Sequence, residues 1–317
     1  MSLRNNTIAT YASTGYVALI NIAVLPLYID YMGPEAFGLI GFFTMIQVWF
    51  TLLDVGLSPL MIRQTALFRG GAITVDELRR ILRSLEGVFA CISILAIFTF
   101  FLSSEFISST WLNVQELSVQ EINNSVSLIG LVVGLRWVGV LYKGVISGFE
   151  HLVWLGAFNS IIATLRFVLV LPVLIYFGPT PSVFFSYQLA IALIELVVLI
   201  IYTYWFLPSI LSKEYVAWSL KPLLKNLKFS AGLTFSNITW IFFSQTDKLL
   251  LSSLLSLIDY GYFMLGVLLA SSVMVISSPI ANVLLPRLSK LHGEGDNSTL
   301  LDLYQDSTQL VAVMAIP

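Results

Sequence analysis

The sequence predicts an all-α polytopic membrane protein, and three observations carry that prediction. The 317 residues are 57% apolar and only 11% charged, whereas soluble domains have about 25% charged residues. The mean hydropathy is +0.89. The apolar residues gather in long runs, and a membrane-spanning helix needs about 20 of them in succession. Finally, Lys and Arg are confined almost entirely to alternate gaps between these runs.

Eight apolar runs are long enough to cross a membrane, and a ninth begins near Ser307. The eight predicted spans are 8–29, 37–61, 85–102, 126–147, 156–177, 183–207, 230–256 and 261–285. A half-span in lipid would leave its last carbonyl groups unsatisfied. We therefore expect the chain to be the front portion of a longer protein, or a disrupted gene product.

The distribution of basic residues predicts the orientation. Thirteen of the 16 Lys and Arg residues lie in alternate gaps, and the gaps between those contain none. Short loops that carry Lys and Arg stay cytoplasmic, so the amino terminus is predicted to be cytoplasmic. In the second basic gap, Thr74 precedes Glu77 by three residues, which is a capping-box pattern. It predicts a short amphipathic helix over 72–83 at the cytoplasmic surface.

A weak internal repeat suggests two halves. An ungapped shift of 223 residues lays the first two predicted spans over the seventh and eighth, so that Gly38 falls on Gly261. Six spans return the chain to its starting side, which favours two parallel helical lobes related by an axis along the membrane normal. We predict a complete first lobe of six spans at 1–207 and a cytoplasmic linker at 208–229. The second lobe, 230–317, is truncated after about two and a half spans.

Three cations lie inside predicted spans: Arg136, Arg166 and Lys248. An intramembrane charge costs at least about 2.5 kcal/mol, so it needs a partner or a task. Arg136 and Lys143 are seven residues apart on one helical face, and Arg166 lies at a similar depth in the next span. A functional interpretation is a cationic cavity for an anionic head group such as pyrophosphate, which Arg binds bidentately. The alternative is a structural ion pair, with Glu195 as the candidate partner of Arg166.

The seventh predicted span carries a polar stripe at helical spacing. Its members are Thr234, Asn237, Ser244, Lys248 and Ser252. The stripe fits a wall of a wet cavity, or equally a set of hydrogen bonds between helices. Asp247 and Lys248 point about 100° apart on a helix, so we expect them not to neutralise each other directly. The candidate substrate-binding residues are Arg136, Arg166, Lys248, Asn237 and Lys143.

Three acidic residues within the predicted spans are candidates for ion coupling: Asp54, Glu195 and Asp247. Each carboxylate could bind a coupling H⁺ or Na⁺, or could anchor a neighbouring span. The chain contains no nucleotide-binding loop, zinc motif or nucleophile elbow, and its one cysteine, Cys91, lies in an apolar run. We therefore expect no cofactor, no bound metal and no nucleic-acid partner.

Several short motifs resemble a known family. They are YMGPEAFGLIG at 31–41, LDVGLS at 53–58 with Arg63, TDKLLLSS at 246–253, YGY at 260–262 and LPRLS at 285–289. These stretches are similar to the polysaccharide flippases, the Wzx-type O-antigen flippases of the multidrug/oligosaccharidyl-lipid/polysaccharide exporter superfamily. The resemblance covers essentially the whole chain.

The resemblance implies a protein of twelve to fourteen helices in the bacterial inner membrane that is a transporter and not an enzyme. It would flip an undecaprenyl-pyrophosphate-linked oligosaccharide to the periplasmic leaflet through a cationic central cavity. The implied partners are this lipid-linked substrate, membrane lipids, a coupling cation and polysaccharide-assembly proteins.

Two other functions stay open at this point. The first is a cation-coupled multidrug antiporter of the same superfamily, in which acidic cavity residues should dominate. The second is a membrane glycosyltransferase or O-antigen polymerase. Such enzymes act at large external loops, whereas the predicted external gaps here are short and devoid of Arg and Lys.

Overall fold

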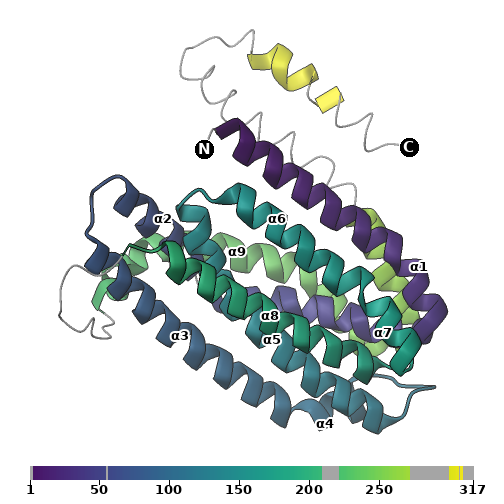
Figure 1. The fold of residues 1–317 in the computed structure, drawn as a ribbon. Helices are drawn as coiled ribbons and strands as arrows, with labels where there is room; N and C mark the ends of the chain where they lie inside the picture. Colours follow the sequence, from purple (N-terminus) through teal and green to yellow (C-terminus); the bar gives the residue numbers. More distant parts are fainter. Residues whose placement is uncertain (1–2, 55, 209–220, 272–299, 307, 310–317) are drawn as a thin grey trace.

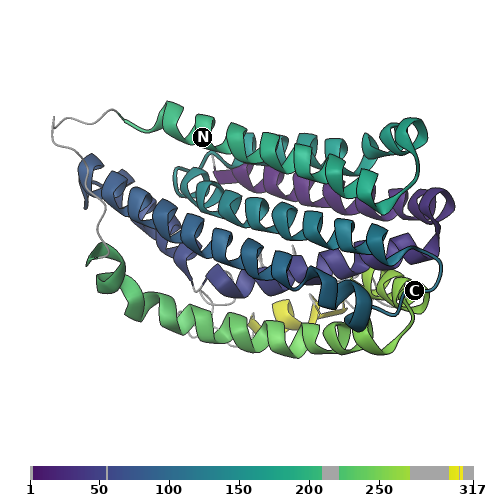
Figure 2. The same ribbon diagram turned by 90° about the horizontal axis from the view of Figure 1, so that it is seen from below.

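The computed structural model describes residues 3–54, 56–208, 221–271, 300–306 and 308–309. Within these ranges the regular elements are helices, and the β-type pairing is a single isolated bridge between Asn113 and Ser256. The helices run side by side along one common direction (Figures 1 and 2). The predicted all-α class is confirmed.

The first helix, α1 (Leu3–Phe50), is bent into two arms that hold the first two predicted spans. At the bend Gly33 has φ 85° and ψ 165°, a conformation that glycine adopts without the steric cost of a Cβ. Pro34 follows it and has no N–H to continue a helical ladder. The second arm therefore runs back beside the first, as Figure 2 shows.

The second predicted span, 37–61, is interrupted, so its prediction as one continuous helix is wrong. A 3₁₀ turn, η1 (Thr51–Asp54), precedes α2 (Leu57–Arg69), and Gly56 between them is left-handed with φ 72°. The Asp54 carboxylate accepts hydrogen bonds from Ser58 N at 2.9 Å and Ser58 Oγ at 2.8 Å. The first of these bonds satisfies one of the backbone N–H groups at the start of α2 that have no partner within the helix.

The next helix, α3 (Val75–Leu102), begins where the capping box predicts. The N–H of Glu77 donates to Thr74 Oγ1 at 3.3 Å. The predicted separate helix over 72–83 is wrong, however, because α3 continues without a break into the third predicted span. Buried Leu78, Ile81 and Leu85 link the two parts in one apolar face. The short α4 (Ser104–Phe106) and the π turn η2 (Ile107–Trp111) follow.

The remaining helices of 1–207 are α5 (Val119–Gly148), α6 (Leu152–Ala163), the π turn η3 (Thr164–Val168), α7 (Val170–Phe177) and α8 (Pro181–Phe206). In the described part of the chain, five segments are long and apolar enough to cross a membrane: Ile8–Asp54, Val75–Trp111, Val119–Gly148, Leu152–Phe177 and Pro181–Phe206. Because the first contains both arms of α1, the five segments account for the six crossings predicted over 8–207, although the second predicted span is covered only as far as Asp54. The chain is a multi-pass membrane protein.

Beyond α8, the structure describes α9 (Lys221–Leu254) and a helix at Leu257–Ser271. Helix α9 begins inside the stretch 208–229 that the sequence assigns to a linker. Most of the predicted eighth span and of the ninth lie outside the described residues. The division into lobes at 1–207 and 230–317 therefore stays a prediction.

At the end of the bundle where α1 bends, which we call the Gly33 end, the segment 111–117 joins two distant parts of the chain. The buried Glu35 carboxylate accepts three backbone N–H groups, from Gln115 at 2.6 Å, Glu116 at 2.8 Å and Leu117 at 2.6 Å. In the same segment Asn113 Nδ2 donates to the carbonyls of Ser253 and Leu255 at 2.9 and 3.2 Å. We call segment 111–117 the strap, because it is bonded both to α1 and to the end of α9.

Beside the strap, the second arm of α1 touches the helix Leu257–Ser271 backbone to backbone. A Cβ built on Gly38 would lie 2.0 Å from Leu257 O, and one built on Gly261 would lie 2.8 Å from Pro34 O. Under the 223-residue shift Gly38 corresponds to Gly261, and Pro34 corresponds to Leu257. The shift therefore turns the Gly38–Leu257 contact into the Gly261–Pro34 contact. Pairs of contacts across a twofold axis are related in this way.

Candidate functional site

A cavity of about 380 Å³ lies between the two arms of α1, the η3 turn, α8, α9 and the helix Leu257–Ser271. This volume falls within the range of about 300–1,000 Å³ that is usual for small-molecule sites. Of the 21 lining residues, 12 are apolar or glycine and nine have polar side chains. The polar lining residues are Asn21, Tyr28, Thr44, Gln47, Arg166, Gln188, Gln245, Lys248 and Ser271.

Behind the cavity, α5 and α8 are joined by two polar contacts one heptad apart. Arg136 Nη2 donates to Gln188 Oε1 at 2.6 Å, and Lys143 Nζ lies 2.6 Å from Glu195 Oε1. Both helices begin at the Gly33 end and run parallel (Figure 1), so both contacts join residues 52 positions apart. The shared face of Arg136 and Lys143 was predicted. The matching face of α8 was missed, although Gln188 and Glu195 show the same spacing of seven.

Arg136 reaches the cavity through its partners. Its Nη1 donates to Gln47 Oε1 at 3.3 Å, and its guanidinium lies 5.3 Å from the centre of the Phe43 ring. Gln47, Gln188 and Phe43 line the cavity, whereas Arg136 is not among the lining residues. Contrary to expectation, Arg136 therefore does not contact the cavity directly but lies behind Gln47 and Gln188, which do. Its charge still acts on that wall.

Arg166 lies in the π turn η3, and neighbouring helices hydrogen-bond the carbonyls on both sides of it. Tyr187 Oη donates to Leu165 O at 2.8 Å, Gln188 Nε2 to Arg166 O at 2.9 Å, and Tyr28 Oη to Phe167 O at 2.8 Å. π turns inside helices occur frequently at functional sites. Sequence reasoning identified Arg166 and missed the turn, because the groups that hold it come from α1 and α8.

The Arg166 side chain lines the cavity, with its guanidinium 5.4 Å from the centre of the Phe167 ring. Its Nε is buried and has no hydrogen-bond partner among the described residues. The alternative, an ion pair of Arg166 with Glu195, is not found, because Lys143 on the parallel helix α5 pairs with that carboxylate at 2.6 Å. Within the described ranges no carboxylate lies within ion-pair distance of Arg166.

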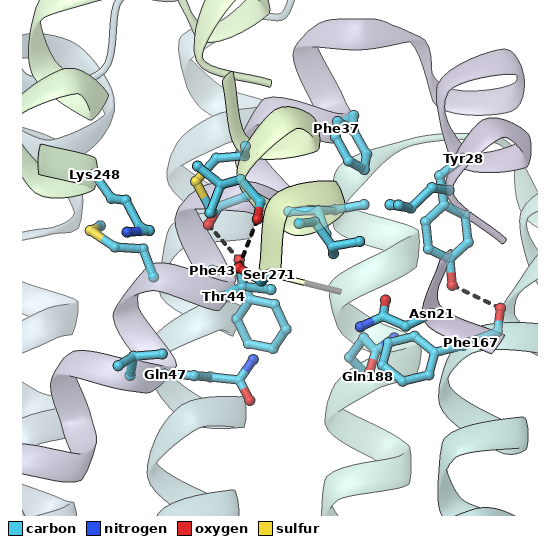
Figure 3. Close-up of a pocket in the computed structure, with 18 of the residues that line it drawn as sticks. Asn21, Tyr28, Phe37, Phe43, Thr44, Gln47, Phe167, Gln188, Lys248 and Ser271 are labelled. Carbon is cyan, nitrogen blue, oxygen red and sulfur yellow. Dashed lines mark hydrogen bonds between the residues drawn. The ribbon is translucent and has the colours of Figure 1, made fainter. Parts of the chain in front are cut away.

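Lys248 lies on the α9 wall, and Figure 3 shows it on the opposite side of the cavity from Asn21 and Gln188. Its Nζ lies 3.2 Å from Asp247 Oδ1 and also donates to Ser244 O. The expectation that Asp247 and Lys248 do not pair is therefore wrong, because the long lysine side chain bends back along the helix. The Asp247 side chain is 55% exposed and that of Lys248 13% exposed. The Asn237 side chain lies outside the described residues.

The acidic candidates have different surroundings. Asp54 is bonded to Ser58 at the start of α2 and is not among the residues that line the cavity. Glu195 is buried, and its second oxygen, Oε2, has no partner in the described part of the chain. Sequence reasoning missed Glu86 of α3, which accepts hydrogen bonds from Tyr142 Oη at 3.0 Å and Tyr204 Oη at 2.8 Å. Both donors lie on other helices, so Glu86 joins three of them.

The charges in and around the cavity are mostly positive. Four cations and two carboxylates belong to this region: Arg136, Lys143, Arg166, Lys248, Glu195 and Asp247. Each carboxylate pairs with a lysine, and neither arginine has a carboxylate of the described residues within ion-pair distance. Together with the amide side chains of the wall, this arrangement suits an anionic ligand that also carries hydroxyl groups. Among the described residues no cluster of His, Cys, Asp and Glu could hold a metal ion.

Comparison with known proteins agrees with the sequence motifs. The family model described as polysaccharide biosynthesis protein matches residues 3–292. That family includes the Wzx-type polysaccharide flippases, and its members are typically transporters. No curated protein and no solved structure matches the chain significantly. Because the match extends over nearly the whole chain, the protein belongs to the polysaccharide biosynthesis protein family.

Proposed function

We propose that the protein flips an undecaprenyl-pyrophosphate-linked oligosaccharide, an O-antigen unit or a similar repeat, across the bacterial inner membrane by alternating access. Family membership supports the coarser role of a polysaccharide-related transporter. The substrate and the mechanism are inferred from the cavity and from the contacts at the Gly33 end.

The observation that carries the proposal is the position of Arg166 in the cavity wall without a carboxylate partner among the described residues. A desolvated guanidinium stays charged and donates to phosphate in a fixed fork. Lys248 on the facing wall and Arg136 behind Gln188 add to the positive potential. The amides of Asn21, Gln47 and Gln188 offer donors and acceptors to sugar hydroxyls. A pyrophosphate with its first sugar matches both properties.

Alternating access requires contacts that close one end of the cavity and can break. The strap and the crossing of Gly38 with Gly261 supply such contacts at the Gly33 end, which the basic-residue pattern predicts to be periplasmic. At the crossing, glycine backbone lies against Leu257 and Pro34, with the Met264 side chain packed beside it. No ion pair of the described residues joins the two helices there, so they can separate without leaving a charge unpaired. On this proposal, the described conformation is closed toward the periplasm.

For energy coupling we propose Glu195 in preference to Asp54 and Asp247. Its Oε2 is buried without a partner among the described residues, whereas Asp54 binds Ser58 and Asp247 is half exposed beside Lys248. A carboxylate with one unoccupied oxygen can bind a proton or Na⁺. On this proposal, the ion pair between Lys143 and Glu195 breaks when Glu195 binds the coupling ion.

The test is replacement of Arg166 and of Lys248 by glutamine in the full gene product. Both variants should lose the ability to restore surface polysaccharide in a host that lacks its own flippase, while immunoblots show near-normal protein levels. Arg80→Gln, which removes an exposed cation of α3 outside the cavity, is the matched control and should restore surface polysaccharide fully. Full restoration by Arg166→Gln and Lys248→Gln would contradict the proposal.

A further inference from the structure

A second and larger cavity lies on another face of the bundle, among α3, α4, α5 and α8. Its volume is about 1,090 Å³, and it shares no lining residue with the cavity described above. Its lining residues are Ile94, Ile97, Phe98, Phe101, Leu102, Ser104, Glu105, Asn123, Asn124, Ser127, Leu128, Leu131, Ser182 and Ser186. Several of these apolar side chains are more than half exposed, among them Ile94, Phe98 and Phe101. In a membrane protein such side chains contact lipid.

The polarity of this groove changes in the same direction along its α3 and α5 walls. On α3 the lining runs from Ile94 and Phe98 to Leu102, and it then reaches Ser104 and Glu105 of α4. On α5, which is antiparallel to α3, it runs from Leu131 through Ser127 to Asn123. On α8 the polar residues Ser182 and Ser186 belong to the first turns. The α3 and α5 walls thus become polar toward the Gly33 end, where α4 and the starts of α5 and α8 lie (Figure 1) and where the α8 wall supplies only polar residues.

The length of the groove fits one leaflet of a bilayer. Ile94 to Leu102 on α3 and Leu131 to Asn123 on α5 each cover eight helical steps, about 12 Å at 1.5 Å per residue. Half of a hydrocarbon core of about 30 Å is about 15 Å. A groove that is apolar over this depth and polar at its outer end has the polarity profile of a single lipid molecule.

The polar end carries one kind of charge. Glu105 is the charged lining residue, and it is exposed and without an ion-pair partner among the described residues. Nearby, Asn123 Oδ1 is buried and has no hydrogen-bond donor within the described ranges. Among the described residues, no Lys, Arg or His lines the groove. Two acceptors without donors, and no cation for a phosphate, favour a head group that donates hydrogen bonds and carries a positive charge.

We propose that this groove binds a membrane lipid with a primary ammonium head group. The ammonium lies at Glu105 and Asn123, and an acyl chain lies along Ile94, Phe98 and Leu131. The site is separate from the transport cavity, so the inference does not depend on which substrate the protein moves.

The test is native mass spectrometry of the intact protein with phosphatidylethanolamine and phosphatidylglycerol that have identical acyl chains. We expect the wild type to retain phosphatidylethanolamine in preference, and Glu105→Gln to reduce that preference by up to about fivefold, the effect of one exposed ion pair. The matched control Glu116→Gln removes an exposed carboxylate at the same end, outside the groove. It should keep the wild-type preference.

A second variant keeps the test decisive. Ser186→Phe places an aromatic ring in the groove at an exposed position of α8 and should weaken binding of both lipids. The proposal is overturned if the wild type binds the two lipids equally or prefers phosphatidylglycerol. It is also overturned if Glu105→Gln and Glu116→Gln behave alike, or if Ser186→Phe leaves lipid binding unchanged.

Discussion

Gly38 and Gly261 lie in contact, and they are equivalent positions of the internal repeat. A Cβ built on Gly261 would lie 3.2 Å from Gly38 Cα. One turn further along, Gly41 packs on Met264, which is again its equivalent under the 223-residue shift; a Cβ on Gly41 would lie 2.7 Å from Met264 Cγ. Residues that touch their own equivalents lie beside the axis that relates two halves. Two lobes related by such an axis would bring these residues together in this way, and the division into lobes stays a prediction.

The glycine crossing gives the first prediction. Gly38→Ala should force the two helices apart, because the added methyl group would lie 2.0 Å from a backbone oxygen. The matched control is Gly15→Ala on the first arm of α1, where nothing lies within 4 Å of the built Cβ. Labelling by a membrane-impermeant thiol reagent, with a cysteine at Phe37 in a Cys91→Ser background, should increase for Gly38→Ala alone. Equal labelling of both variants would show that the crossing does not close this end.

The second prediction concerns Arg136. Arg136→Ala should abolish transport in the intact protein while leaving protein levels near normal, because the side chain is held mainly by Gln47 and Gln188 and not by an acid. Gln188→Leu should reduce transport as well, since it removes the acceptor that positions Arg136. Surface polysaccharide and immunoblots of the same cultures provide the measurement. Parallel loss of protein and of transport would instead indicate a structural role.

The third prediction concerns Lys143, for which we expect a role in stability where Arg136 and Arg166 have one in transport. Lys143→Met should lower the free energy of unfolding in detergent by about 3 kcal/mol, because removal of one partner leaves the buried Glu195 charge unpaired. The double variant Lys143→Met, Glu195→Met should recover most of that loss. Thermal unfolding followed by tryptophan fluorescence tests both. A double variant as unstable as the single one would show that the destabilisation does not come from the unpaired charge.

The fourth prediction concerns the strap. Glu35→Ala removes the acceptor of three backbone N–H groups, and each buried donor left unsatisfied costs about 1–3 kcal/mol. Hydrogen exchange at Gln115, Glu116 and Leu117 should therefore become faster. Exchange in α6, far along the chain, should stay unchanged and serves as the internal control. Unchanged exchange at 115–117 would mean that Glu35 does not hold the strap.

Much of the architecture can be predicted from the sequence, because membrane spans depend on composition and length. The six helical crossings of 1–207 and the common face of Arg136 and Lys143 follow from apolar runs and helical spacing. The partner of Glu195 could not be predicted, since Lys143 and Arg166 compete for it and the register of α5 against α8 decides the outcome. The π turn at Arg166 was equally out of reach, because hydroxyl and amide groups from other helices bind its carbonyls. The strap depends on an acid that lies about 80 residues away from it.

The two polar contacts between α5 and α8 have a mechanical consequence. Sliding one helix along the other by a single residue, about 1.5 Å, would strain the Arg136–Gln188 and Lys143–Glu195 contacts together, since both have the same offset of 52 residues. A larger slip would leave two cations unpaired inside a membrane. The two contacts therefore fix the register of α5 against α8, and the pair resists sliding of one helix along the other at mid-membrane depth. Motion during a transport cycle is then expected at contacts that lack such polar pairs, and the crossing of Gly38 with Gly261 between α1 and the helix Leu257–Ser271 is one of them.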